Sequence, residues 1–152
     1  MSELIFGNLI SGYVLFEENV IQKLNRYRQS PGLLEAGGIL IGYRRPPHLH
    51  VVSITLPMKR DQRSAINFLR KDPRHSFIAK SWWCNSSEEV YYLGEWHTHP
   101  QDYPSPSFID KRGWDILLKS KIGPDLLFLI VGKKTWYVQR RDEVIFRLDL
   151  IS

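Results

Sequence analysis

The chain consists mainly of short apolar segments separated by turn residues, and this pattern constrains its fold more than any other feature. Several segments have the length and the β-branched and aromatic content of strands: 12–16, 36–43, 48–56, 89–98, 125–131, 135–140 and 143–149. Three others read as helices: 17–28, 75–83 and 107–121. This order predicts a mixed α/β (α+β) fold, in which two or three helices pack against one sheet.

The length of the chain restricts its domain organisation. Its 152 residues suffice for one hydrophobic core but not for a TIM barrel or a two-domain dinucleotide enzyme. Apolar residues make up 43% and charged residues 24%, which excludes a disordered or coiled-coil chain. We therefore expect a single domain over 1–152, with a polar, irregular segment at 59–72 inside a basic and aromatic insertion around 59–88.

The only cysteine, Cys84, excludes an intrachain disulfide framework and any zinc or iron–sulfur site built from several cysteines. Because Cys84 follows Trp82 and Trp83, we expect a packed thiol. The first twenty residues lack a basic start, and polar residues interrupt their apolar stretches. We therefore expect neither a signal peptide nor a membrane span, and predict a cytoplasmic protein.

The charge of the chain is basic but dispersed. Lys and Arg exceed Asp and Glu by 21 to 16, a formal net charge of +5. The basic residues occur in twos and threes along the chain, and no motif of a nucleic-acid-binding fold accompanies them. A solvated basic surface is therefore favoured over a nucleic-acid site, and the sequence does not specify an oligomeric state.

The sharpest chemical signal is His97-Thr98-His99-Pro100, at the end of the predicted strand 89–98. In a strand, residues two apart point to the same face, so both imidazoles project together. Two imidazoles on one rigid strand can bind a borderline metal such as Zn²⁺, and a catalytic zinc site needs a third protein ligand.

Asp110 is the best candidate for the third ligand. It lies in the first turn of the predicted helix 107–121, where a carboxylate is a good oxygen donor for zinc. Ser107, three residues earlier, lies on the same helical face and can hydrogen-bond an oxyanion. Ser107-x-x-Asp110 is equally typical of a helix N-cap followed by an acidic first-turn residue. The two roles are partly compatible.

A metal-bound water also needs a general base, and two glutamates compete for this role. Glu95 lies two residues before His97 on the same face of the strand. Glu35 lies far upstream, before the paired glycines Gly37 and Gly38 that allow a close approach of backbone. Spacing alone leaves both open.

Three blocks together resemble a known family. They are Glu35-x-Gly37-Gly38-x-Leu40-x-Gly42, His97-Thr98-His99-Pro100 and Ser107-x-x-Asp110. In order, spacing and residue type they are similar to the JAB/JAMM (MPN-domain) zinc metalloproteases. The resemblance implies a curved mixed β-sheet around one helix with others outside, in a cytidine-deaminase-like layout.

The resemblance also implies a role for each residue. His97, His99 and Asp110 would ligate Zn²⁺, Glu35 would be the general base and acid, and Ser107 would stabilise the oxyanion. Such enzymes hydrolyse the isopeptide or peptide bond after the C-terminus of ubiquitin or a ubiquitin-like protein. The alternatives are a non-catalytic MPN scaffold that binds such a partner, and a general metallopeptidase.

The segment around 59–88 is similar, more loosely, to small bacterial members encoded in anti-phage defence operons, which remove a modifier or a conjugated nucleotidyltransferase from its target. We therefore expect this segment to form part of the groove for the substrate's C-terminal tail. Its candidate contacts are Arg63, Arg70, Trp82 and Trp83.

Three further features are interpreted as structural. His48-x-His50 is a second histidine pair, but no acidic residue is near it in sequence, so we expect exposed or half-buried side chains without metal. His75 is given no metal role. Trp96, Trp114 and Trp136 are expected in the core.

Overall fold

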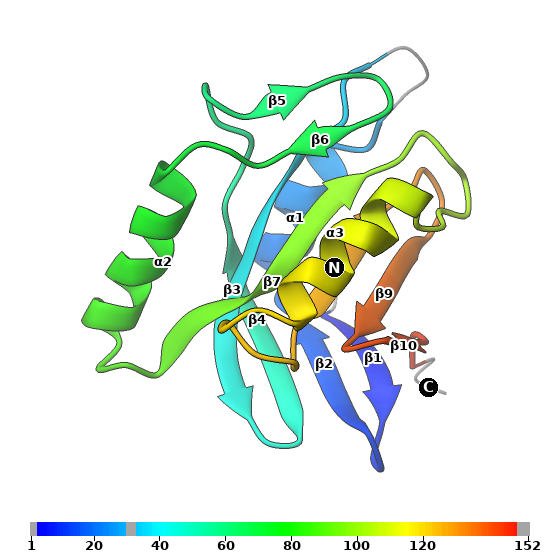
Figure 1. Ribbon diagram of the computed structural model, residues 1–152. Coiled ribbons are helices and arrows are strands. Elements are labelled where there is room, and N and C mark those ends of the chain that lie inside the picture. The colour runs from blue at the N-terminus through cyan, green and yellow to red at the C-terminus, as the bar shows by residue number, and fades with distance from the viewer. Residues whose placement is uncertain (1–2, 30–32, 149–152) are drawn as a thin grey trace.

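The computed structural model describes residues 3–29 and 33–148 and confirms a mixed α/β fold with three helices and one large sheet (Figure 1). The helices are α1 (Glu18–Arg26), α2 (Arg74–Asn85) and α3 (Phe108–Leu118). The strands of the large sheet are β1 (Leu4–Asn8), β2 (Gly12–Phe16), β3 (Gly37–Arg45), β4 (His48–Ile54), β7 (Val90–Thr98), β8 (Leu127–Val131), β9 (Trp136–Arg140) and β10 (Glu143–Ile145). Their order across the sheet is β1-β2-β4-β3-β7-β8-β9-β10, and β5 (Gln62–Arg63) and β6 (Phe68–Leu69) form a separate hairpin.

The central strand β8 shows why this sheet is covered on both faces. All five of its residues are buried, and they alternate between two hydrophobic clusters. Leu127, Leu129 and Val131 join the main core, which contains the apolar face of α1. Phe128 and Ile130 pack on the other face, against Trp114 of α3. Helix α2 covers a third cluster, on β3 and β7.

The sheet curves around α1 until its two ends nearly meet. The register shifts twice within β3, after Leu40 and after Ile41, and such irregularities bend a strand. At the far end, the backbone of Gly7 donates to Phe146 at 2.8 Å, and Leu148 donates to Ile5 at 2.8 Å. Residues after β10 therefore cover the outer edge of β1, and α1 lies inside the curve while α2 and α3 lie outside it (Figure 1).

Most predicted elements are found within a few residues of their expected bounds. Strand β1 and the hairpin β5–β6 were not predicted, and the last strand ends at Ile145 rather than at 149, a residue outside the described range. No helix among the described residues is long and apolar enough to cross a membrane.

Two expectations about side chains need correction. Cys84 is exposed rather than packed; the apolar residues of α2 that pack on the sheet are Ile78 and Ala79. Helix α3 packs mainly through Trp114, while its Phe108 is 79% exposed and its Ile116 64%. Trp96 and Trp114 are buried as predicted. Trp136 is only half-buried.

Candidate metal centre

The two histidines are held at the end of a strand in the middle of the sheet. Strand β7 pairs with β3 on one side and β8 on the other, which places His97 opposite Gly37 and Ile130. Just beyond the strand, the backbone N–H of His99 donates to Val131 at 3.1 Å. Both imidazoles are buried to 7% exposure and lie on the same face, as the alternation predicted.

The first turn of α3 brings a carboxylate onto these imidazoles. Ser107 is the N-cap, and its hydroxyl accepts from the backbone N–H of Asp110 at 3.1 Å. The Asp110 carboxylate accepts in return from the backbone N–H of Ser107 at 2.8 Å. The capping interpretation of Ser107-x-x-Asp110 is therefore confirmed, and the same capping box fixes Asp110 as it faces the histidines.

The three side chains form a triangle of the size that a metal ion needs. The two histidine Nε2 atoms lie 3.1 Å apart, and Asp110 places one oxygen 3.3 Å from His97 Nε2 and the other 3.1 Å from His99 Nε2. Ligands at about 2.0–2.1 Å from a tetrahedral zinc lie about 3.3–3.4 Å from one another. These residues are the only group with such geometry in the described part of the chain.

A second side chain orients His99. Nδ1 of His99 lies 3.2 Å from Oε1 of Gln101, an amide oxygen that also accepts from the backbone N–H of Ser105. An amide oxygen can only accept, so Nδ1 carries a proton, and Nε2, which faces Asp110, is the nitrogen that would bind a metal in place of its own proton. The sequence analysis missed Gln101, although its position two residues after His99 was the available signal.

Glu35 reaches the same site from the segment just before β3, the strand that pairs with β7. Its side chain is only 3% exposed, and its Oε1 lies 3.6 Å from His99 Nε2. Burial raises the pKa of Glu35 to about 7; the charge of His99 opposes this rise, and that of Asp110 adds to it. A carboxyl with this pKa can both take up and release a proton near neutral pH.

Asp110 behaves in the opposite way. Burial by itself raises its pKa, but hydrogen bonds from His97 and His99 outweigh burial and hold the pKa well below its usual range. Two carboxyls a few ångströms apart therefore differ in charge state at neutral pH. Asp110 suits a permanently ionised ligand, whereas Glu35 suits a proton carrier.

Glu95, the competing glutamate, has other partners. Arg70 of the hairpin donates to both of its carboxylate oxygens at 2.7–3.0 Å, and the Tyr92 hydroxyl donates at 3.1 Å. Burial raises the pKa of Glu95, but Arg70 engages both of its oxygens, so neither is free to take a proton from a water at the candidate metal. The geometry therefore favours Glu35 over Glu95 as the base.

A groove of about 310 Å³ opens beside the candidate site, between the hairpin and α3. Its lining includes His97 and Asp110 together with Asn67–Arg70. Trp82 and Trp83 lie on α2 and are not part of the lining, and Arg63 points instead to the backbone of Glu35. Of the expected tail contacts, only Arg70 lines the groove.

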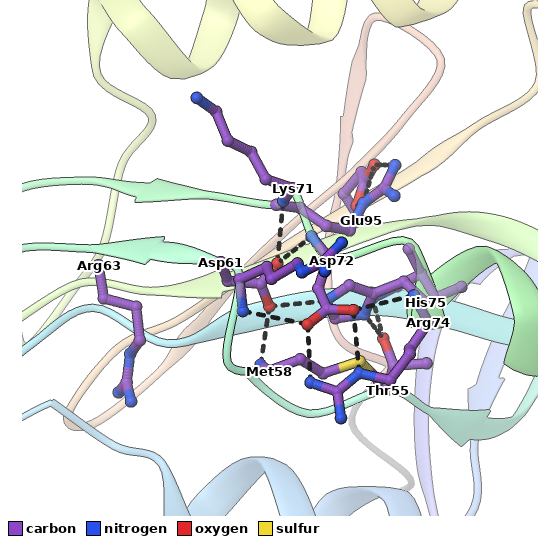
Figure 2. A network of polar contacts seen from close by, with 12 residues as sticks. Thr55, Met58, Asp61, Arg63, Lys71, Asp72, Arg74, His75 and Glu95 are labelled. Atoms are coloured by element: carbon purple, nitrogen blue, oxygen red, sulfur yellow. Dashed lines mark hydrogen bonds and ion pairs between the residues drawn. The ribbon is translucent and has the colours of Figure 1, made fainter.

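The base of the hairpin is fixed by one buried carboxylate (Figure 2). Asp61 accepts from the backbone N–H groups of Met58, Lys71 and Asp72 at 2.8–2.9 Å. It also lies 2.7 Å from Nε2 of His75, which has no exposed surface. The segment expected to be irregular therefore has a defined fold, and His75 has a structural partner in Asp61.

The second histidine pair is half-buried, as predicted, and each side chain has a partner in or just after β2. His48 Nδ1 accepts from the backbone N–H of Tyr13 at 2.9 Å. His50 Nε2 lies 3.0 Å from Glu17, a carboxylate that parallel pairing of β2 with β4 brings close. The acidic partner Glu17 is thus near in space although it is distant in sequence. His48 and His50 nevertheless have separate partners.

Comparisons with known proteins give the same fold and a family. The family model "Prokaryotic homologs of the JAB domain" matches residues 17–148. A protein of Escherichia coli (strain TW11681) named "CD-NTase/cGAS isopeptidase" is 36% identical over 142 residues, which are 93% of this chain and 90% of that protein. A protein of the same name from Vibrio cholerae serotype O1 is 35% identical over 92% of this chain and 89% of that protein.

One solved structure supports the fold, and only the fold. The solution structure of a protein from Desulfitobacterium hafniense superposes with a TM-score of 0.59 at 23% identity. The superposition covers 90% of this chain and 90% of that one. It agrees with the curved mixed sheet described above.

Proposed function

Because this chain belongs to the prokaryotic JAB-domain family, we propose that it is a zinc-dependent isopeptidase whose metal ligands are His97, His99 and Asp110. The observation that carries this proposal is the convergence of three metal donors with the buried carboxyl of Glu35 beside an open groove. The names of its relatives support the reaction class: the proteins from Escherichia coli and Vibrio cholerae are named isopeptidases.

The donor set fits zinc better than other divalent ions. Two imidazole nitrogens and one carboxylate oxygen suit a borderline ion, whereas Mg²⁺ and Ca²⁺ prefer oxygen donors throughout. Three protein ligands leave one coordination position for solvent, which is typical of catalytic zinc sites. When bound, zinc supplies a water of lowered pKa and polarises the scissile carbonyl.

The chain's own residues do the rest of the chemistry. Glu35 takes the proton from the attacking water and delivers it to the leaving amine, the ε-nitrogen of a lysine in an isopeptide. Ser107 donates its hydroxyl hydrogen to the developing oxyanion, since its oxygen is already an acceptor for Asp110 N–H. Gln101 holds His99 in the tautomer with a free Nε2.

We place the C-terminal tail of the conjugated protein in the groove between the hairpin and α3. His97 and Asp110 are among the lining residues of this groove, so a tail bound in it lies beside the candidate metal. Arg70, held by Glu95, is the basic residue along this path. By analogy with the names of the relatives, we propose that the tail belongs to a CD-NTase-like protein or a ubiquitin-like modifier, in cytoplasmic anti-phage signalling.

The test is a cleavage assay with the variant Glu35→Gln. The substrate is a conjugate in which the C-terminal carboxylate of a CD-NTase from the same genome is joined to a lysine side chain. The wild type is expected to release the free CD-NTase, and Glu35→Gln to lose about 10²–10⁴-fold in rate while it retains one zinc per chain. The matched control is Glu89→Gln, at an exposed site before β7.

Other outcomes would favour the alternatives. A wild type that binds zinc and the CD-NTase but cleaves nothing would be a scaffold. Cleavage of casein as fast as of the conjugate would indicate a general metallopeptidase. Retention of full activity by Glu35→Gln would remove Glu35 from the mechanism.

A further inference from the structure

The backbone of Glu35, the proposed general base, is held by hydrogen bonds outside the regular sheet pairing. Glu35 lies before the first residue of β3, where regular sheet pairing has not begun. Its backbone N–H donates to the carbonyl of Ser64 at 2.7 Å, and its own carbonyl accepts from Nε of Arg63 at 2.7 Å. Both backbone groups of the base are therefore held by the end of β5 and the loop that follows it.

The next residue along the chain is held from the opposite side. The backbone N–H of Ala36 donates to the Thr98 hydroxyl at 2.9 Å, and the backbone N–H of Thr98 donates to the carbonyl of Ala36 at 2.9 Å. The Glu35–Ala36 peptide is thus clamped between the metal-binding strand and the hairpin loop. Removal of the hairpin contact would leave Glu35 fixed on one side only.

The loop that holds Glu35 is itself well braced. The backbone N–H of Ser64 donates to Asn67 at 2.9 Å, and the buried amide of Gln29 donates to the carbonyl of Ala65 at 3.1 Å. Phe68 lies so close over Gly37 that a methyl group there would overlap its ring. The Asp61 network fixes the other end of the hairpin (Figure 2).

We propose that Arg63 is a positioning residue for Glu35: its guanidinium, with the Ser64 carbonyl, sets where the base stands relative to the candidate metal. This inference rests on the proposed role of Glu35 as the general base. Arg63 suits the task because a guanidinium donates from a planar, permanently charged group, which strengthens its bond to a carbonyl. A displacement of about 1 Å at a reacting group can lower a rate by about 10²-fold.

The same hairpin also walls the groove, through Asn67, Phe68, Leu69 and Arg70. The hairpin therefore contacts both the proposed position of the tail and the backbone of Glu35. Arg63 acts on the chemical step and not on the binding of the tail, which distinguishes it from Arg70.

The test compares Arg63→Gln with the matched control Arg60→Gln, an exposed arginine of the same segment. With the CD-NTase conjugate as substrate, we expect Arg63→Gln to lower kcat by about 10- to 100-fold, with KM and zinc content within about twofold of the wild type. Arg60→Gln should match the wild type in all three.

A second measurement does not depend on activity. Amide hydrogen exchange, followed by NMR, should be at least about tenfold faster for Glu35 N–H in Arg63→Gln, while the amide of Leu129 in the core stays protected and shows that the variant is folded. A raised KM with unchanged kcat would make Arg63 a substrate contact, and unchanged kinetics or Glu35 exchange would also overturn the proposal. Absence of cleavage by the wild type would instead contradict the proposed function, and the exchange result would still decide whether Arg63 holds Glu35.

Discussion

At the scale of single residues, Ser107 has one observed role and one proposed role, and substitution can separate them. Its oxygen caps α3 by accepting from Asp110, and its hydrogen is available to an oxyanion. Glycine is a tolerable N-cap but has no hydroxyl, so it removes the second role with little effect on the first.

Ser107→Gly is therefore expected to lower kcat by about 10²–10³-fold, the usual effect of removing one oxyanion donor. Its free energy of unfolding, measured by urea denaturation, should fall by only a few tenths of a kcal/mol. Ser107→Thr, which retains the hydroxyl, is the control. Equal kcat for Ser107→Gly and the wild type would limit Ser107 to capping.

The candidate site shows which residues a sequence can indicate. His97 and His99 are predicted by strand alternation, and Asp110 and Ser107 by their place in a first helical turn. Glu35 could be chosen over Glu95 only through a family resemblance, because the difference lies in Arg70, which reaches Glu95 across 25 positions. Gln101, Thr98 and Arg63 act through hydrogen bonds that no spacing rule reveals.

At the scale of elements, the hairpin β5–β6 depends on the single carboxylate of Asp61. Burial raises its pKa, but hydrogen bonds from backbone N–H groups and from His75 outweigh burial, and the net pKa lies below its ordinary value. A carboxyl with a lowered pKa stabilises the fold at pH values above its unfolded pKa of about 4. This contribution is lost as the pH falls through the lower, folded pKa.

Asp61→Asn should thus destabilise the metal-free protein at pH 7 by about 1–3 kcal/mol, because an amide cannot accept all of these bonds. The difference from the wild type should shrink as the pH falls below about 4, because the unfolded wild-type chain takes up a proton there and the folded carboxyl does so only at a lower pH. Urea denaturation at pH 7 and pH 3 measures both values. The control is Asp142→Asn, at an exposed position; a difference independent of pH would contradict this account.

The same hairpin explains why the fold was predicted only in part. Every residue of the predicted strand 125–131 after Asp125 is apolar, and the burial of this run in β8 follows from composition alone. The segment 59–72 has little apolar content, and its order comes from polar bonds to Asp61 and Glu35 that join residues far apart in sequence. Strand β1 was missed although it forms a local hairpin with β2; only its contacts with residues after β10 join segments far apart in sequence.

At the scale of the whole molecule, the candidate metal lies at the end of a sheet that has its own core. Helix α1 fills the curved sheet with buried apolar side chains, whereas the candidate ligands lie at the end of β7 and in the first turn of α3. The fold should therefore persist without metal, unlike a zinc finger, whose folding requires it.

Removal of zinc with EDTA is accordingly expected to lower the thermal midpoint without loss of secondary structure. Zinc present at about 100 times its Kd stabilises the folded state by about 2.7 kcal/mol. Circular dichroism, recorded during thermal unfolding with and without zinc, checks both points. Unfolding by EDTA at 25 °C would show that the sheet depends on the metal.

The most direct test of the account is anomalous diffraction at the zinc absorption edge from crystals grown with one equivalent of zinc. We expect one peak at about 2.0–2.2 Å from His97 Nε2, His99 Nε2 and an oxygen of Asp110, with solvent as the fourth ligand and Glu35 adjacent. A peak elsewhere, or none at these three side chains, would contradict the proposed metal centre and with it the isopeptidase mechanism.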